Sequence, residues 1–120
     1  MIRKDKCYTR PMKLTKKKCI PCEDKSVKPL TRKEALVYMK EVPQWTLARN
    51  AKQISRSWLF SDFVKALKFV NSIGKLAEKE GHHPDIEILY NKVTLNLWTH
   101  SIKGLSENDF IVAAKADKIA

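Results

Sequence analysis

The sequence predicts an α+β fold, in which about three helices pack on one face of a four-stranded antiparallel sheet. The first observation is a long segment, from Ser61 to Gly81, in which apolar residues recur at helical spacing. The second is that two shorter β-rich segments precede this segment and two follow it. The third is the order of the segments, because strands that follow each other directly favour antiparallel hairpins.

The first 29 residues differ from the rest in composition and pattern. Residues 1–29 hold 10 lysines and arginines against 3 acidic residues, whereas residues 30–120 hold 14 against 10, within a net charge of +11 for the 120 residues. The segment also contains three of the five prolines and shows no sustained helical or alternating pattern. We therefore expect residues 1–29 to be a flexible basic leader and residues 30–120 to form one domain.

The domain is expected to begin with a short helix and a hairpin. Thr31 and Glu34 have the spacing of a capping box. The helix is expected to end at about Val42, which precedes a proline and is therefore disfavoured in helical conformation. Residues 45–48 and 54–60 alternate between two faces, as strands do, and a polar interruption separates them.

The second half is expected to contain the long helix, a second hairpin and a last helix. Ser61 can cap the long helix, and Gly81 can end it. Its expected buried stripe consists of Phe63, Val64, Leu67, Val70, Ile73, Leu76 and Ala77. The β-rich segments Ile86–Tyr90 and Val93–Thr99 are separated by two residues, which permits a tight hairpin. The last helix is expected to begin at Ser106.

The composition argues against several classes of protein. No apolar run approaches the roughly 20 residues that cross a bilayer, and the N-terminus lacks the apolar centre of a secretory signal. Cys7, Cys19 and Cys22 are odd in number and cannot form a disulfide framework. Cys19 and Cys22 have the spacing of a redox pair or half a zinc site, but incidental thiols in a leader are the simpler interpretation. We expect a cytoplasmic protein, with organelle targeting by the basic leader as the alternative.

The three histidines are the main functional signal. His82 and His83 follow the long helix, and His100 lies at the end of the last strand, so one rim of the sheet can carry all three. Histidine has an unperturbed pKa of about 6.5, and such a group can supply both a proton donor and an acceptor near neutral pH. The alternative is three solvated surface histidines. A histidine-only zinc site fits less well, because adjacent side chains diverge.

Four other side chains have two interpretations each. Asp109 lies three residues after the expected N-cap of the last helix, which is the spacing of a capping-box carboxylate. Glu78, one turn before the paired histidines, can orient a histidine or be solvated. Trp45 is expected in the core by default, and Trp98 can instead line a flat aromatic pocket beside the third histidine.

The segment at residues 78–85, Glu-Lys-Glu-Gly-His-His-Pro-Asp, resembles the pterin-4a-carbinolamine dehydratases. The resemblance continues through Tyr90-Asn91-Lys92-Val93, Thr99-His100 and the Gly-Leu-Ser-Glu-Asn-Asp-Phe run of residues 104–110, and it covers roughly residues 30–117. The Gly-His-His-Pro-Asp form is similar to the bacterial-type branch. The animal enzymes have an acidic residue where Gly81 stands, so no role of that acid is transferred to this chain.

The resemblance implies a reaction and roles for the site residues. The family dehydrates 4a-hydroxytetrahydropterin to quinonoid dihydropterin, for pterin recycling, without a metal or a cofactor, since the pterin is the substrate. His82 and His100 are implied as the acid and the base, with no direction between them, and His83 as a pterin-binding residue. Trp45 is implied as a second substrate-binding residue, which shapes the pocket, and Glu78 and Asp109 as supporting residues, which orient the imidazoles.

The resemblance also implies a homodimer or homotetramer and a pathway link to an aromatic amino acid hydroxylase. Some relatives act instead as a dimerisation cofactor of a homeodomain transcription factor or as assembly chaperones, and the presence of all three histidines favours catalysis over these roles. Binding of nucleic acid through the leader is not expected, because Tyr8 is its only aromatic residue available for stacking. No membrane partner is expected.

Overall fold

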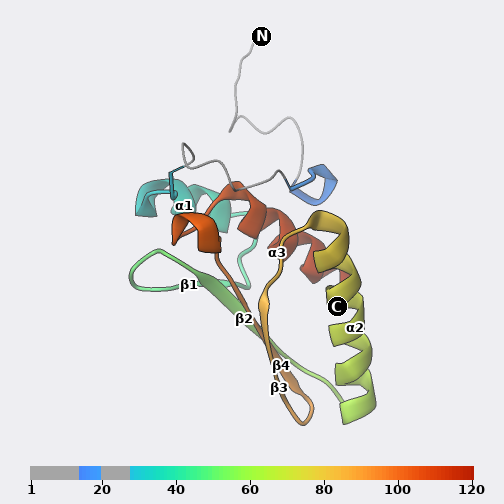
Figure 1. Ribbon diagram of the computed structural model, residues 1–120. Coiled ribbons are helices and arrows are strands. Elements are labelled where there is room, and N and C mark those ends of the chain that lie inside the picture. The colour runs from blue at the N-terminus through green and yellow to red at the C-terminus, as the bar shows by residue number, and fades with distance from the viewer. Residues whose placement is uncertain (1–13, 20–27) are drawn as a thin grey trace.

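The computed structural model describes residues 14–19 and 28–120 (Figure 1). The helices are α1 (Arg32–Met39), α2 (Phe63–Glu80) and α3 (Glu107–Ile119), with two short 3-10 helices, η1 (Leu14–Lys16) and η2 (His100–Ile102). The strands are β1 (Thr46–Leu47), β2 (Ile54–Leu59), β3 (Asp85–Leu89) and β4 (Lys92–Leu97). Within the described residues, no helix has the length and apolarity that crossing a bilayer requires.

The four strands form one sheet in the order β1-β2-β4-β3, and every neighbouring pair is antiparallel. β2 and β4 pair along the centre of the sheet, with Ile54 opposite Leu97. β3 and β4 form a hairpin in which Asp85 lies opposite Asn96. The predicted four-stranded antiparallel sheet is confirmed.

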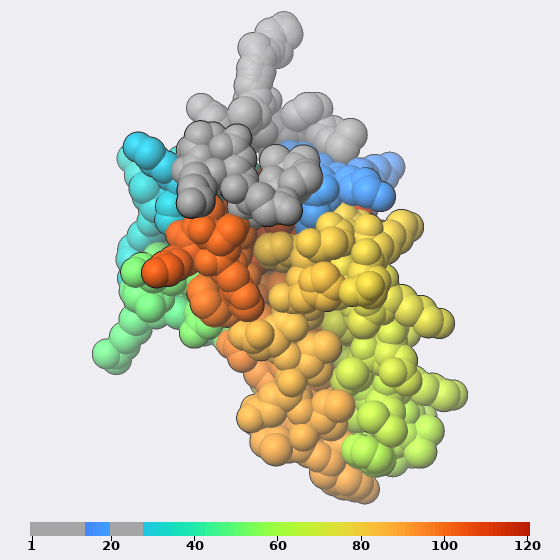
Figure 2. Space-filling view, viewed as in Figure 1, coloured from blue at the N-terminus to red at the C-terminus, as the bar shows by residue number. Residues whose placement is uncertain are grey.

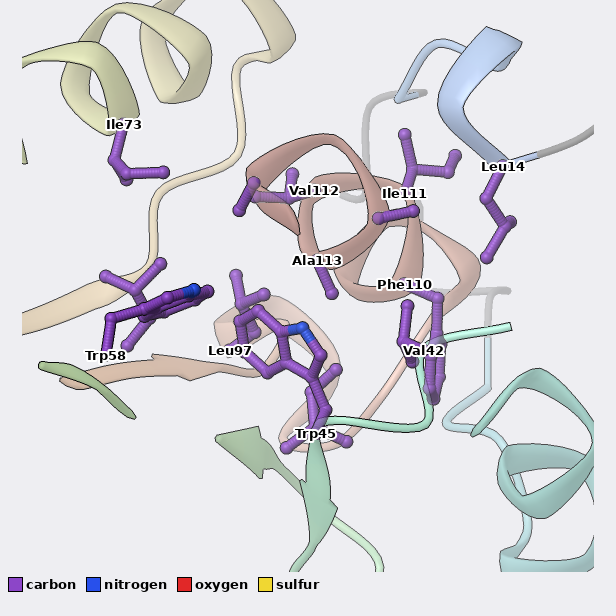
Figure 3. Packing of buried hydrophobic residues seen from close by; sticks show 14 of the residues in the cluster. Leu14, Val42, Trp45, Trp58, Ile73, Leu97, Phe110, Ile111, Val112 and Ala113 are labelled. Atoms are coloured by element: carbon purple, nitrogen blue, oxygen red, sulfur yellow. The ribbon is translucent and has the colours of Figure 1, made fainter. Parts of the chain in front are cut away.

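The helices α2 and α3 lie together on one face of the sheet, and α1 contacts α3 (Figure 1). The inner face of the two central strands contributes the buried residues Ile54, Trp58, Val93, Leu95 and Leu97. Figure 3 shows side chains from these strands and from α3 converging in one cluster. The opposite face of the sheet is more polar, and there Ser57 and Thr94 share a hydrogen bond of 2.7 Å. The predicted α+β layering is therefore also confirmed.

The helix α3 lies at the centre of the core. Residues 108–114 are all buried, and the helix contacts α1, α2 and η1. A helix that is covered on several sides has no single polar face, which is why its sequence shows no sharp apolar stripe. Asp109, in its first turn, is consequently shielded from water.

Several element boundaries differ from those expected. Most strand ends are displaced by one or two residues, so that the second hairpin turns at Tyr90-Asn91 instead of Asn91-Lys92 and β4 ends at Leu97 instead of Thr99. α1 ends at Met39 instead of near Val42, because the chain turns before Pro43. α2 is capped by Asp62 instead of Ser61, and the Asp62 carboxylate accepts a hydrogen bond of 2.8 Å from the amide of Lys65. The 3-10 helix η2 was not expected, and it places His100 just beyond the end of β4.

The buried side of α2 differs from the expected stripe. The residues that it buries are Ala66, Phe69, Ile73, Ala77 and Glu80. Phe63, Val64 and Leu67 are instead 44%, 61% and 37% exposed. Side chains three or four positions apart share one side of a helix, and the side defined by Ala66 is the one that faces the core. The core-facing side of α2 therefore ends in a carboxylate, Glu80.

Residues 14–19, which belong to the expected leader, pack against α3. Leu14 is buried in the core cluster, and Lys17 Nζ lies 2.6 Å from Glu107 Oε2. Figure 2 shows this segment (blue) against the end of α2 and the residues that follow it (yellow). Most of the expected leader, including Cys7 and Cys22, lies outside the described residues, so the boundary at residue 29 stays a prediction.

Candidate active site

His82 is directed into the protein by the way α2 ends. Gly81 adopts the left-handed conformation, with a φ of 66°, which is typical of a residue that terminates a helix. The amide of His82 then donates to the carbonyl of Ala77 at 3.1 Å. The imidazole reaches the first turn of α3, where its Nε2 lies 2.6 Å from Asp109 Oδ1. The side chain of His82 is 10% exposed and that of Asp109 is fully buried.

The carboxylate of Asp109 is fixed by two further contacts on its other side. Its Oδ2 accepts hydrogen bonds from the amide of Ser106 at 3.0 Å and from the Thr99 hydroxyl at 2.8 Å. The hydroxyls of Thr99 and Ser106 share a hydrogen bond of 2.7 Å. Ser106 and Asp109 form the capping box of α3 that the sequence predicted. The same carboxylate therefore caps a helix and holds a histidine.

The contact with Asp109 determines which nitrogen of His82 carries a proton. A carboxylate accepts hydrogen bonds, so the neutral imidazole donates from Nε2 and leaves Nδ1 as an acceptor. A proton taken up at Nδ1 gives an imidazolium that the neighbouring carboxylate stabilises, as in other histidine–carboxylate pairs. His82 can thus act as a general base at Nδ1.

His83 points to a different carboxylate, at the surface. Its Nε2 lies 2.6 Å from Glu78 Oε2, and the two side chains are 61% and 79% exposed. Contacts between exposed charged groups contribute little to stability. This pair is available to a ligand, and Glu78 orients His83 instead of His82.

His100 lies against an aromatic ring. Its imidazole is 3.9 Å, centroid to centroid, from the indole of Trp98, with 46° between the planes. Trp98 Nε1 donates a hydrogen bond of 3.1 Å to Asp85 Oδ2 on the neighbouring strand β3. The ring of Trp98 therefore fixes one face of the His100 imidazole.

Two hydrogen-bonded connections join the segments that carry the histidines. Asp109 links His82 to Thr99, the residue before His100. Asp85 and Trp98 join the start of β3, which follows His83, to the end of β4. The structure therefore brings the loop after α2 and the end of β4 side by side, as the sequence predicted.

Trp45 lies in the core and is not among the contacts of the histidines described above. Its indole Nε1 donates a hydrogen bond of 2.9 Å to Asp117 Oδ1, and its ring packs edge-on against Trp58 (Figure 3). Asp117 also pairs with Arg56 at 2.7 Å. The default expectation of a core tryptophan is confirmed, and a role of Trp45 in shaping a substrate pocket stays a prediction.

Three polar residues of this region were not predicted from the sequence. Thr99, Asp85 and Glu80 had no assigned role, although Glu80 continues the helical spacing of the buried side of α2. A carboxylate on an apolar stripe is a usable signal, because such groups are buried only with partners. Thr99 and Asp85 gave no comparable signal, since their partners lie on other elements.

Other features lie apart from the histidines. An open groove of about 290 Å³ is lined by Phe60, Lys65, Lys68, Phe69, Ser72, Ile119 and Ala120. It borders the first half of α2, whereas the histidines follow its last turn. Across residues 14–19 and 28–120, no three His, Cys, Asp or Glu side chains are grouped as metal ligands would be.

The fold and the site together define a class of protein: a small α+β domain with histidines fixed by carboxylates and an aromatic ring at one end of its sheet. The model of the family described as pterin 4 alpha carbinolamine dehydratase matches residues 28–119. The chain belongs to this family.

Individual relatives agree with this membership. The chain is 47% identical over 107 residues to a protein of Azoarcus sp. that is named as a pterin-4-alpha-carbinolamine dehydratase. The matched residues cover 89% of this chain and 91% of the relative. It is 40% identical over 109 residues to pterin-4-alpha-carbinolamine dehydratase 2, mitochondrial, of Arabidopsis thaliana, over 88% of this chain and 58% of that protein. The crystal structure of a transcriptional coactivator/pterin dehydratase from Brucella melitensis superimposes with a TM-score of 0.73 at 35% identity, over 77% of this chain and 98% of that one.

Proposed function

We propose that this protein is a hydro-lyase that converts 4a-hydroxytetrahydropterin to quinonoid dihydropterin by histidine acid–base catalysis, in tetrahydropterin recycling. The reaction breaks the bond between C4a and the hydroxyl oxygen and removes the proton from N5, so that a C4a–N5 double bond and one water are formed. The observation that carries the proposal is the pair of His82 and Asp109, which Thr99 joins to the segment of His100. Family membership supports the same reaction.

The contacts of the two histidines favour one direction of proton transfer. His82 accepts the N5 proton at Nδ1, because its Nε2 is bound to Asp109 and the resulting imidazolium is stabilised there. His100, which packs against Trp98 and has no carboxylate contact among those described above, then takes the other role and donates a proton to the departing hydroxyl. The water leaves with the proton of His100. His82 then gives up the proton that it took from N5 and His100 takes one up, either directly between the two rings or through solvent, so that both return to their starting states.

The remaining residues bind and orient. His83, with Glu78 on its Nε2, is exposed and can contact the pterin. Trp45 would shape the pterin pocket from the core, where its indole is held by Asp117. The pterin is the substrate, and the proposed step requires no metal and no further cofactor. We expect the hydroxylated pterin to be supplied by an aromatic amino acid hydroxylase.

The test is the rate of dehydration of 4a-hydroxytetrahydropterin, followed by ultraviolet absorbance. The wild-type protein should accelerate it, and His82→Ala and His100→Ala should each lower kcat by about 100-fold or more. Lys118→Met, an exposed substitution on α3, is the control and should retain the wild-type rate. Circular dichroism establishes that each variant is folded. Wild-type rates in both histidine variants would contradict the proposed acid and base.

A second candidate function is that of a non-catalytic dimerisation cofactor or assembly chaperone. The name of the Brucella melitensis protein includes transcriptional coactivator, and the exposed apolar side chains at the start of α2 suit a protein partner. Under this alternative the folded wild-type protein would not accelerate dehydration, and His82→Ala would leave binding of the partner unchanged.

The cellular location depends on the basic leader. We expect a cytoplasmic protein, and the word mitochondrial in the name of the Arabidopsis relative supports organelle targeting by the basic leader as the alternative. A fluorescent fusion of the full chain, compared with one that lacks residues 1–13, separates the two.

A further inference from the structure

Glu80 is a buried carboxylate that the proposed reaction does not use. It is the last residue of α2, and its side chain is 1% exposed. Its Oε2 lies 2.6 Å from Lys115 Nζ on α3, and its Oε1 accepts a hydrogen bond of 2.9 Å from the amide of Cys19. Burial raises the pKa of Glu80, but the hydrogen bonds from Cys19 and Lys115, with the charge of the lysine, outweigh burial and hold the pKa below its usual value. Glu80 is therefore charged at neutral pH and depends on both partners.

The segment that supplies the Cys19 amide is itself anchored on α3. Leu14 is buried in the core, and Lys17 pairs with Glu107 at 2.6 Å. Cys19 Sγ lies 3.6 Å from the carbonyl oxygen of Asn108. Residues 14–19 therefore connect the first turn of α3 to the last residue of α2.

The contacts of Glu80 and His82 join the same two helices at neighbouring points. Glu80 connects the end of α2 to Lys115, and His82, two residues later, reaches Asp109 on the same helix α3. Gly81 lies between them in a left-handed conformation and allows rotation more readily than other residues do. With Glu80 attached to α3, rotation at Gly81 can displace His82 only over a short distance.

The geometry points to Glu80 as a positioning residue, which with the Cys19 amide and Lys115 fixes the end of α2 so that His82 stays on Asp109. We call these three groups the Glu80 clasp. Its effect on catalysis rests on the proposed function, whereas its effect on His82 does not. Small displacements of a catalytic group have large effects on rate, so the loss of the clasp should lower kcat more than it changes KM.

Three substitutions test the clasp. Glu80→Ala removes both contacts, Glu80→Gln keeps one acceptor oxygen, and Lys115→Met removes the charged partner. Glu80→Ala should lower kcat about tenfold and leave KM within about twofold of the wild-type value. The kcat of Glu80→Gln should lie between those of Glu80→Ala and the wild type. Lys118→Met, on an exposed part of the same helix, is the matched control for Lys115→Met.

A measurement without substrate separates positioning from a general loss of stability. The ¹⁵N chemical shifts of the His82 ring report which nitrogen carries the proton, and in the wild type they should show protonation at Nε2. In folded Glu80→Ala, these shifts should move toward a mixture of both tautomers. If Glu80→Ala does not fold, the same change is expected in Lys115→Met. A folded variant with wild-type His82 shifts and wild-type kcat would overturn the inference.

The two proposals can fail separately. If the wild type does not dehydrate the pterin, the His82 shifts still decide whether the clasp holds the imidazole. If the wild type is active and neither kcat nor the shifts respond to Glu80→Ala, the clasp is rejected while the proposed function stands.

Discussion

Asp109 serves two purposes with one carboxylate. Its Oδ2 completes the cap of α3, and its Oδ1 binds His82. The cap is local, three residues from Ser106, and the sequence predicted it from that spacing. The contact with His82 spans 27 positions and depends on how α2 ends, so the sequence could place both residues in one region but could not pair them.

Glu80 and Trp45 show where residue-level prediction fails. The burial of Glu80 depends on an amide at Cys19 and an ammonium at Lys115, both far away in the sequence. The indole of Trp45 finds its acceptor on Asp117, 72 positions later. Polar groups in a core are stable only with such partners, and partners on other elements leave no periodic signal in a sequence.

The ionisation of Glu80 predicts a specific pH dependence of stability. Its pKa is lower in the folded protein than the ordinary value of 4.5, so its contribution is present above about pH 4.5 and is lost as the pH falls through the folded pKa. The free energy of unfolding of the wild type should therefore fall more steeply with acid than that of Glu80→Gln. Urea denaturation from pH 7 to pH 3 measures this difference, and parallel curves would contradict it. At pH 7 we expect Glu80→Gln to be about 2 kcal/mol less stable.

The environment of Cys19 predicts an unreactive thiol. Burial, together with the negative charge of Glu80, raises the pKa of Cys19 to about 12. The thiolate is the reactive form, so labelling with iodoacetamide at pH 8 should be at least about tenfold slower in the folded protein than in urea. Mass spectrometry of the peptide that contains Cys19 gives both rates. Equal rates would show that the segment is not packed on α3 in solution.

At the scale of elements, the periodicity of apolar residues predicted the type and order of the helices and strands better than it predicted their buried sides. The long helix, both hairpins and the last helix were expected and are present, because each has a pattern of its own. The buried side of α2 was misassigned, because Phe63, Val64 and Leu67 extend the apolar pattern without facing the core. Packing against the sheet decides which apolar side of a helix is covered, and that information is not local.

The end of α2 depends on the backbone of Gly81. A Cβ at Gly81 or at Gly74 would meet no atom within 4 Å, but only Gly81 has a positive φ, of 66°. Gly81→Ala should therefore lower the free energy of unfolding by about 1 kcal/mol, whereas Gly74→Ala, inside α2, should raise it by up to about 1 kcal/mol. Urea denaturation of both variants tests the pair. If both substitutions changed the free energy of unfolding equally, the positive φ at position 81 would carry no cost for a residue with a side chain.

At the scale of the whole molecule, the two ends of the sheet differ in character. The histidines lie where α2 ends, β3 begins and β4 ends. The opposite end presents exposed apolar side chains from β2, α2 and the β3–β4 turn, which are Leu59, Phe63, Val64, Leu89 and Tyr90. This separation would allow the protein to self-associate without covering the site, and we propose that the apolar end is where the homodimer or homotetramer implied by the resemblance forms.

The apolar end predicts a test of self-association. Val64 is 61% exposed, and a charge there would be costly to bury between two copies. Val64→Glu should weaken self-association at least about tenfold in sedimentation velocity. Lys75→Glu, at another exposed position of α2, is the charge control. A wild-type protein that is monomeric at micromolar concentration would contradict the proposed oligomer.

The most direct test of the account is the dehydration rate of Asp109→Asn. The central claim is that His82, held by the Asp109 carboxylate, removes the proton from the pterin. An amide offers only one acceptor oxygen, so it cannot serve the α3 cap and His82 together. We predict that kcat falls by about 10- to 100-fold in a variant that remains folded by circular dichroism. A folded Asp109→Asn protein with the wild-type kcat would contradict the claim.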